Sequence, residues 1–337
     1  MPAAVETMVS VVSNEASQAA KDRTVPWHGL GVQVPEVLDD AQVLTLAGLD
    51  WRVSLRDTFY LNTQTGQFEP VDKAKAVVRD TDERVLGRVG DLYVPIQNDE
   101  MIEFGSALVD TTKAKWDTAG SLKGGAITFA SFRMDDIEGI KIGGQASEEL
   151  RSYLLVTNAH DGSRAFKAAV VPIRVVCMNT LQAALGRQQS SWSIKHTKNS
   201  TTRVDEARRA LDLTVDYVEE FKAIAERLAD VDHTVEEIES FIEEWVPLPE
   251  KRGVDAALAN REALLGNILG SPTIPADLRK TSWGVFNGLT EWAEWERDQR
   301  SDKRTPAPER RMVSTLLAGP VAQIRDRAWR DLTAAVR

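Results

Sequence analysis

Residues 150–177 read LRSYLLVTNAHDGSRAFKAAVVPIRVVC, and their pattern is the clearest indication of the fold class. Two runs rich in Val, Leu, Tyr and Phe lie on either side of Asp161-Gly162. An Asp-Gly pair adopts the positive backbone angles that tight hairpin turns require. The stretch therefore predicts two antiparallel strands joined at this pair.

The rest of the chain predicts further strands on both sides of this hairpin and helices after them. Further strand-like segments, some paired by turn signals, lie at 51–61, 73–80, 84–90, 124–134 and 191–197. After Thr202 the apolar residues recur at helical spacing almost to the end of the chain. The predicted class is α+β, with an antiparallel-hairpin-rich sheet, packed helices and an all-helical C-terminal unit. We expect a flexible arm at 1–24, an α+β core domain with a basic stretch at 25–203, and a helical, acidic domain at 204–337.

Composition excludes several classes of protein. Cys177 is the only cysteine among 337 residues, which excludes a disulfide scaffold and a Cys-rich zinc site. No apolar stretch is long enough to suggest a membrane span, and the N-terminal residues do not resemble a secretory signal. These features predict a soluble, cytoplasmic protein with no membrane partner.

Charge is distributed unevenly along the chain. The formal net charge is −10, yet the segment from Gly162 to Val204 has no Asp or Glu and seven Lys and Arg residues. Burial in strands explains the missing acids but not the seven bases, so we predict an anionic partner, nucleic acid in particular. The candidate nucleic-acid-binding residues are Arg164, Lys167, Arg187, Trp192, Lys195, His196, Lys198 and Arg203.

Trp192 is the one aromatic side chain in this candidate set. It lies in SSWSIKHTK, among basic residues, and an aromatic ring beside cations is what a base-stacking surface requires. A tryptophan in a short apolar strand is equally typical of a buried core. The sequence leaves both roles open.

Three of the four histidines lie in the predicted α+β part, and they suggest a different chemistry. His28, His160 and His196 would form a metal site for an enzyme if folding brought them together, with Asp161 as a neighbouring acid or base. Their spacing matches no known ligand pattern, and a histidine beside an Asp-Gly turn is more typical of a hydrogen-bonded loop. We therefore predict no metal and no cofactor, and keep the enzyme as an alternative.

Several motifs occur in a fixed order and together resemble one family. They are PWHGLG, AVVRDTDERVLGRVGDLYVPIQNDEMIEF, DTAGSLKGG, LLVTNAHDGSRA, PIRVVCMNTLQAAL, IKHT and TSWGVFNGLTEWAEW. The family is the phage/plasmid-like one catalogued as domain of unknown function 932, and the resemblance covers nearly the whole chain from Pro26. It supplies no catalytic residues. It implies a setting in phages, plasmids and their bacterial hosts, where proteins commonly handle DNA.

Three hypotheses follow. The first is a protein that binds single-stranded DNA and anneals it in recombination or replication, with the acidic helical unit shielding the groove, driving oligomer assembly or binding a partner protein. The second is a metal-assisted enzyme built on His28, His160 and His196. The third is a host-modulating interaction factor that binds no nucleic acid.

Overall fold

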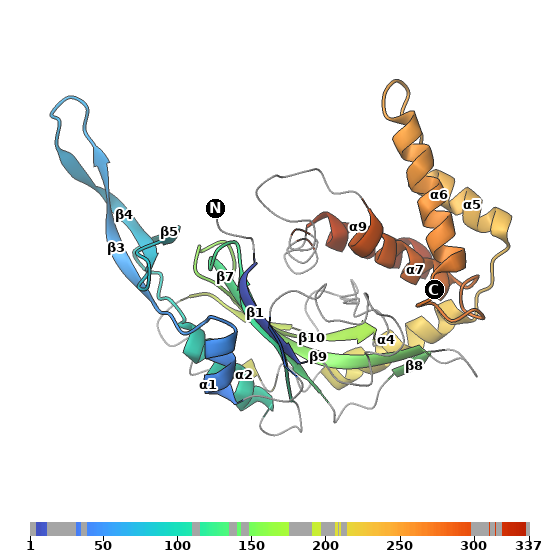
Figure 1. Ribbon diagram of the computed structural model, residues 1–337, viewed down its shortest axis with the longest axis horizontal. Helices are drawn as coiled ribbons and strands as arrows, with labels where there is room; N and C mark the ends of the chain where they lie inside the picture. Colours follow the sequence, from blue (N-terminus) through green and yellow to red (C-terminus); the bar gives the residue numbers. More distant parts are fainter. Residues whose placement is uncertain are drawn as a thin grey trace.

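A central β-sheet, a projecting second sheet and a set of helices make up the molecule (Figure 1). The computed structural model describes residues 5–11, 32–34, 39–109, 115–134, 140–142, 148–174, 191–196, 206–207, 209, 214–297, 310, 314 and 319–334.

The central sheet has eight strands in the order β11-β10-β9-β7-β6-β1-β2, with β8 also paired to β9. Every pairing is antiparallel except that of β1 with β2. The predicted α+β class, with mainly antiparallel strands, is confirmed. The strands are β1 (Val5–Val11), β2 (Val32–Val34), β6 (Lys115–Leu122), β7 (Ile127–Arg133), β8 (Ile140–Ile142), β9 (Glu148–Ala159), β10 (Phe166–Arg174) and β11 (Ser191–Ile194).

The hairpin predicted around Asp161-Gly162 is present in the structure. β9 and β10 pair from Thr157–Lys167 to Leu150–Arg174, and Asp161-Gly162 lies in the turn between them. Gly162 has a φ of 71°, a left-handed conformation that glycine adopts without strain. Asp161 accepts a hydrogen bond from the amide of Ser163, which further fixes the turn.

The prediction of a flexible arm over residues 1–24 is wrong for Val5–Val11. These residues form β1, which lies between β6 and β2 in the central sheet. Met8 and Val9 are only 1% and 3% exposed. The strand was not predicted because Glu and Ser interrupt its β-branched residues, Val and Thr, which favour strand structure.

A second sheet of three strands, ordered β3-β4-β5, projects from the body (Figure 1). It comprises β3 (Val53–Leu61), β4 (Phe68–Arg79) and β5 (Val85–Gly90). β5 pairs only with residues 74–78 of β4, so the rest of the β3–β4 hairpin is two-stranded. We call residues 58–72, the outer part of this hairpin, the β arm.

Helices cover one face of the central sheet and form the C-terminal part of the chain. α1 begins after an Asp39–Gln42 capping box, and α5 begins after a Thr234–Glu237 capping box, as their sequences favour. The helices are α1 (Asp40–Leu46), α2 (Asn98–Val109), α4 (Thr214–Ala229), α5 (Val235–Trp245), α6 (Val254–Gly270), α7 (Ser282–Glu291) with a π-helical continuation η3 (Trp292–Glu296), and α9 (Pro320–Ala334).

One large apolar cluster runs from the sheet into the helices. It includes Phe104 of α2 and Trp192 of β11, and continues to Phe221, Trp283 and Trp329 of the helical part. The cluster is thus continuous across the predicted domain boundary near residue 203. A smaller cluster lies on the other face of the central sheet, where its described members all belong to strands. No helix within the described ranges is long and apolar enough to cross a membrane.

Candidate functional site

Alternation along β10 and β11 separates the predicted nucleic-acid-binding residues onto two faces of the sheet. Lys167 is paired with Ser193, while the neighbouring pair, Ala168 with Trp192, points the opposite way. Trp192 therefore faces the side covered by α2, and Lys167 faces away from it. Just after β11, Lys195 is exposed whereas His196 is buried.

The ring of Trp192 is part of the protein interior. It is 6% exposed and stacks on Phe104 of α2 at 5.3 Å between centroids and 19° between planes. Phe166 meets its edge at 6.3 Å. A ring enclosed in this way offers no face to a base, so its predicted stacking on nucleic acid does not fit the structure. The alternative role of Trp192, as part of the core, fits the structure.

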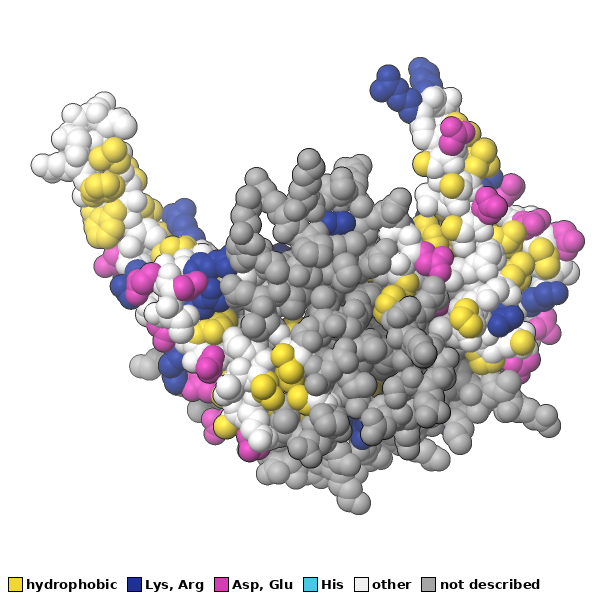
Figure 2. Space-filling model, viewed as in Figure 1, with side chains coloured by type: hydrophobic (Ala, Val, Ile, Leu, Met, Phe, Trp, Pro, Cys, Tyr) yellow, Lys and Arg dark blue, Asp and Glu magenta, His cyan; other side chains and the backbone are white. Residues whose placement is uncertain are grey.

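Basic side chains from several segments meet at the end of the central sheet where β6–β7 and β9–β10 make their turns. β5 lies against both turns: a Cβ atom on Gly87 would overlap Asp161, and one on Gly124 would overlap the guanidinium of Arg84. The six cations at this end are Arg84, Arg88, Lys123, Arg164, Lys167 and Lys195. We call this set the turn-end basic surface. Dark blue side chains gather at the base of the projecting sheet in Figure 2.

Three members of this surface, Arg164, Lys167 and Lys195, were predicted from the acid-free segment. The other three were missed because they lie in distant parts of the sequence, in ERVLGR and SLKGG, and only the fold brings them together. Arg88, Lys123, Arg164 and Lys195 are exposed, and the other two are half-buried. Acidic residues lie among them too: Asp161 is in the β9–β10 turn, and Asp82 accepts a hydrogen bond from the backbone amide of Arg84 at 3.3 Å.

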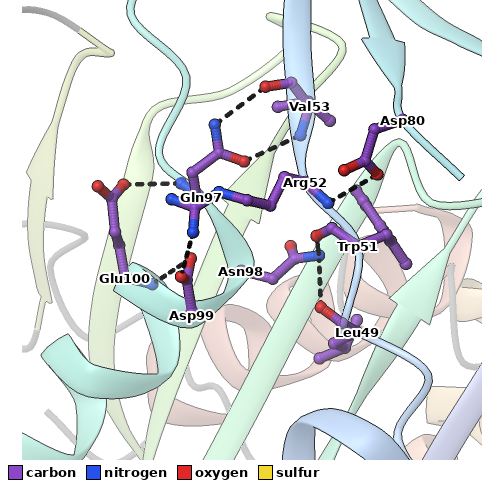
Figure 3. Close-up of polar contacts among 9 residues, drawn as sticks. All are labelled: Leu49, Trp51, Arg52, Val53, Asp80, Gln97, Asn98, Asp99 and Glu100. Carbon is purple, nitrogen blue, oxygen red and sulfur yellow. Dashed lines mark hydrogen bonds and ion pairs between the residues drawn. The ribbon is translucent and has the colours of Figure 1, made fainter.

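Side chains at the start of α2 are hydrogen-bonded to the backbone at and just before the start of β3 (Figure 3). The Asn98 side-chain amide donates to the carbonyl oxygens of Leu49 and Trp51, both at 3.1 Å. The Gln97 side chain accepts from the amide of Val53 at 2.9 Å and donates to its carbonyl at 3.0 Å. The two bonds of Asn98 fix its side-chain amide with Nδ2 towards these carbonyls, and the two bonds of Gln97 hold the start of α2 against β3.

The side-chain oxygen of Asn98 determines the protonation of His160. Nε2 of His160 lies 3.0 Å from Oδ1 of Asn98, and both hydrogens of the Asn98 amide are already donated to carbonyl groups. His160 must therefore donate through Nε2–H, which leaves Nδ1 as a bare lone pair. Nδ1 is buried and has no hydrogen-bond partner. Burial, and to a smaller extent the nearby His196, lowers the pKa of His160 to about 3, so the ring is neutral at pH 7.

His196 lies close to His160 and is also enclosed. Its ring stacks on Tyr93 at 4.8 Å and 20°, and both of its ring nitrogens are without a hydrogen-bond partner. Burial lowers the pKa of His196 to about 4. The hydroxyl of Tyr93 donates to the carbonyl of Ala159 at 2.9 Å, which ties the Tyr93–His196 pair to the end of β9.

Unsatisfied polar atoms continue along the sheet from the two histidines. Oδ1 of Asn158 is buried without a partner, although its Nδ2 donates to the carbonyl of Ile96 at 2.8 Å. Ser121 Oγ is also unpartnered, and Thr128 lies between Ser121 and Asn158 in the strand register. A buried polar atom left unpaired is costly, so a cluster of them marks a place where water or a ligand group would be stabilised.

The other predicted metal-site residue, His28, lies outside the described residues, as do Arg187, Lys198, Arg203 and Cys177. The structure thus brings two of the three histidines together. Within the described ranges, no group of three or more His, Cys, Asp or Glu residues could hold a metal ion. Asn98, Asn158 and Tyr93 were missed as companions of the histidines, although QND, NAH and LYV stand in the motifs that carry the family resemblance.

A buried carboxylate lies at the opposite end of the same sheet. Asp117 of β6 is 8% exposed and accepts hydrogen bonds from Thr118 at 2.9 Å and Ser131 at 3.2 Å. Burial raises the pKa of Asp117 to about 6, against the lowering effect of these bonds and of Arg133. Asp117 was not predicted from the sequence, because a lone Asp in a strand is typical of a solvent-facing position.

Comparison with known proteins identifies one family. The family model described as Domain of unknown function (DUF932) matches residues 85–314, which include β5, all the strands from β6 to β11 and most of the helices. Searches of curated proteins and of solved structures gave no match.

Proposed function

The chain belongs to the DUF932 family, and from its own geometry we propose that it binds single-stranded DNA at the turn-end basic surface. The observation that carries the proposal is the meeting of six cations from four separate segments at one end of the sheet. Cations gathered in this way neutralise successive phosphates and release their counterions, which supplies most of the affinity of sequence-independent binding. A role in annealing, within recombination or replication of phage or plasmid DNA, would follow from such binding.

Apolar side chains beside the cations favour an unpaired strand over a duplex. Leu92 and Val94 are 82% and 40% exposed, and the amide of Val94 donates to the carbonyl of His196, next to Lys195. Unpaired bases present apolar faces that such side chains can contact, whereas a duplex hides them. The pairing of charge with exposed apolar groups therefore supports single-stranded DNA as the ligand.

The test is a salt titration of binding to random-sequence single-stranded DNA, followed by fluorescence anisotropy. Each phosphate contact on a single strand contributes a slope of about −0.7 to log K against log salt, so four engaged cations give about −3. Arg164→Ala with Lys195→Ala should reduce the magnitude of the slope by about 1.4. Both side chains are exposed, so the fold should be unaffected.

The matched control removes the same charge elsewhere. Lys251 and Arg252 are exposed and lie before α6, and Lys251→Ala with Arg252→Ala should leave the slope unchanged. Equal losses in the two double variants would mean that net charge alone drives binding. Failure of the wild-type protein to bind any DNA at low salt would end the proposal and favour the interaction factor without nucleic-acid binding.

The second candidate is the metal-assisted enzyme, and the bare nitrogens of His160 and His196 are the observation that favours it. A metal-ligating histidine characteristically donates its other ring N–H to a fixed acceptor, as His160 does to Asn98. Zn²⁺, Co²⁺ or Ni²⁺ should then raise the unfolding temperature of the wild-type protein and not that of His196→Gln. An unfolding temperature that is insensitive to all three metals would remove this candidate.

A further inference from the structure

We propose that the tip of the β arm is a contact surface for a second copy of this chain, with two arms packing face to face. Four apolar side chains share one side of the tip, because Phe59 is paired with Pro70 and Leu61 with Phe68 in the β3–β4 register. Phe59, Leu61 and Phe68 are 57%, 52% and 74% exposed, and Pro70 is exposed too. We call these four residues the arm face. Yellow side chains mark the arm at the upper left of Figure 2.

The opposite side of the tip is polar and internally bonded. Glu69 accepts a hydrogen bond from the hydroxyl of Tyr60 at 2.6 Å and another from the side-chain Nδ2 of Asn62 at 2.7 Å. The turn is also held in place, since Asn62 accepts at its side-chain oxygen from the amide of Gln64 at 2.9 Å. The arm therefore presents its apolar face in a preformed shape, which lowers the entropy cost of a contact.

Charge argues against nucleic acid as the occupant of the arm face. Residues 58–71 contain no Lys or Arg, and Glu69 is their one charged residue. A surface without cations cannot neutralise phosphates, which dominate the affinity for DNA or RNA. Clustered apolar side chains on a projecting element are instead typical of protein contacts.

The charge of the whole chain limits contact between two copies to the arm tips. Each copy carries a formal net charge of −10, so close approach of two bodies is opposed by repulsion. β3 has nine residues and spans about 30 Å, several times the screening length of about 8 Å at physiological salt. Contact through the tips therefore brings apolar groups together while the acidic bodies stay beyond the reach of their mutual repulsion.

The arm face is also compatible with its own copy. It offers no unpaired charge, and pairing one such face with another places Phe59 and Phe68 against apolar groups only. The arm face has four residues, against roughly 20–30 per side in a standard interface, so the dimer should be weak, with a dissociation constant on the order of micromolar.

The experiment is light scattering or sedimentation of the full chain over a range of concentrations up to about 100 μM, where a micromolar dimer is well populated. The wild-type protein should shift from monomer to dimer, and the dimer should persist at high salt because apolar contacts are not screened. Phe59→Ser with Phe68→Ser should raise the dissociation constant at least about tenfold.

Tyr60→Ser is the matched control, because it removes an exposed aromatic ring from the opposite side of the same arm and should leave the dimer intact. A wild-type protein that stays monomeric throughout, or a dimer that the double variant does not weaken, would overturn the proposal. So would a double variant that loses DNA binding with no change in oligomeric state, since that result assigns the arm face to nucleic acid. The proposal does not depend on DNA binding, and a dimer found in a protein that binds no DNA would still support it.

Discussion

The turn end of the central sheet and the tip of the β arm are both ends of antiparallel hairpins, yet they have opposite surfaces. At the turn end, cations lie on the surface, two neutral histidines are buried, and the turns pack against β5. At the arm tip, apolar side chains are exposed and the polar groups bond only to one another. The type of secondary structure is the same in both places. What differs is whether a second layer of chain lies over the hairpin, and this decides which residues are free to meet a partner.

The largest expected effect comes from removing the Asn98 side chain, which joins the start of α2 to the backbone before β3 and to His160. Asn98→Ala would leave the carbonyls of Leu49 and Trp51 and Nε2–H of His160 without partners in a buried site. Each unsatisfied group costs about 1–3 kcal/mol, so the loss of all three should lower the free energy of unfolding by at least about 3 kcal/mol in urea titrations. An arm counterpart, Asn62→Ala, should cost under about 1 kcal/mol because water replaces its bonds. Similar losses at the two sites would contradict the contrast between them.

Acid should destabilise the turn end next most strongly. His160 and His196 have folded-state pKa values of about 3 and about 4, below the value of about 6.5 in an unfolded chain. The unfolded state therefore binds protons first, and stability is lost as the pH falls from about 6.5 towards these values. At pH 5 each histidine should lower the free energy of unfolding by about 2 kcal/mol relative to pH 7.

Chemical denaturation at both pH values measures this loss, and His196→Gln provides the control. That variant should lose about half of the acid sensitivity, because one titrating group is gone. An unchanged pH dependence would show that His196 is not held neutral in the folded protein.

The far end of the same sheet should respond to pH in the opposite direction. Asp117 has a folded-state pKa of about 6, above the unfolded value of about 3.8, so its ionisation costs stability as the pH rises between these values. Asp117→Asn should therefore stabilise the protein by about 1–3 kcal/mol at pH 8, with the gain vanishing near pH 4. Thermal unfolding at the two pH values tests this, and a variant that is destabilised at pH 8 would mean that the carboxylate has a partner requiring its charge.

The smallest expected effect is at the arm tip. Phe59→Ser with Phe68→Ser should change the free energy of unfolding of the monomer by no more than about 0.5 kcal/mol, because both rings are mostly exposed. Urea titration at a protein concentration below the dimer range measures this. A loss of several kcal/mol would show that the arm face supports the monomer fold, and the contrast with the turn end would fail.

Local signals predicted the hairpins, but not which side of each strand meets the interior. Asp161-Gly162 specified the β9–β10 turn because its conformation depends on two neighbouring residues. The burial of Trp192 depends on the register between β10 and β11 and on α2 packing over that face of the sheet. Neither can be inferred from the residues next to Trp192 in the sequence. Phe59 and Leu61 have the pattern of strand residues that face a core, yet both are more than half exposed in the β arm.

The candidate site was predictable only where its members are close in sequence. Arg164, Lys167 and Lys195 came from one acid-free segment, whereas Arg84, Arg88 and Lys123 joined them through tertiary contacts. His160 and His196 were recognised as a possible pair by residue type. The tautomer of His160 required the orientation of Asn98, 62 residues earlier in the chain.

The position of β1 has a consequence for how the protein is made. Val9 is paired with Ala119, so β1 leaves the ribosome more than a hundred residues before this antiparallel partner. At a synthesis rate of about 5–20 residues per second, that interval lasts several seconds, during which Val5–Val11 lacks its antiparallel neighbour β6. Contacts this distant in sequence also slow folding, because a long loop must close before they form. Closure of the central sheet is therefore a late, post-emergence event, and the edge of β6 stays open to chaperones or to wrong partners until it happens.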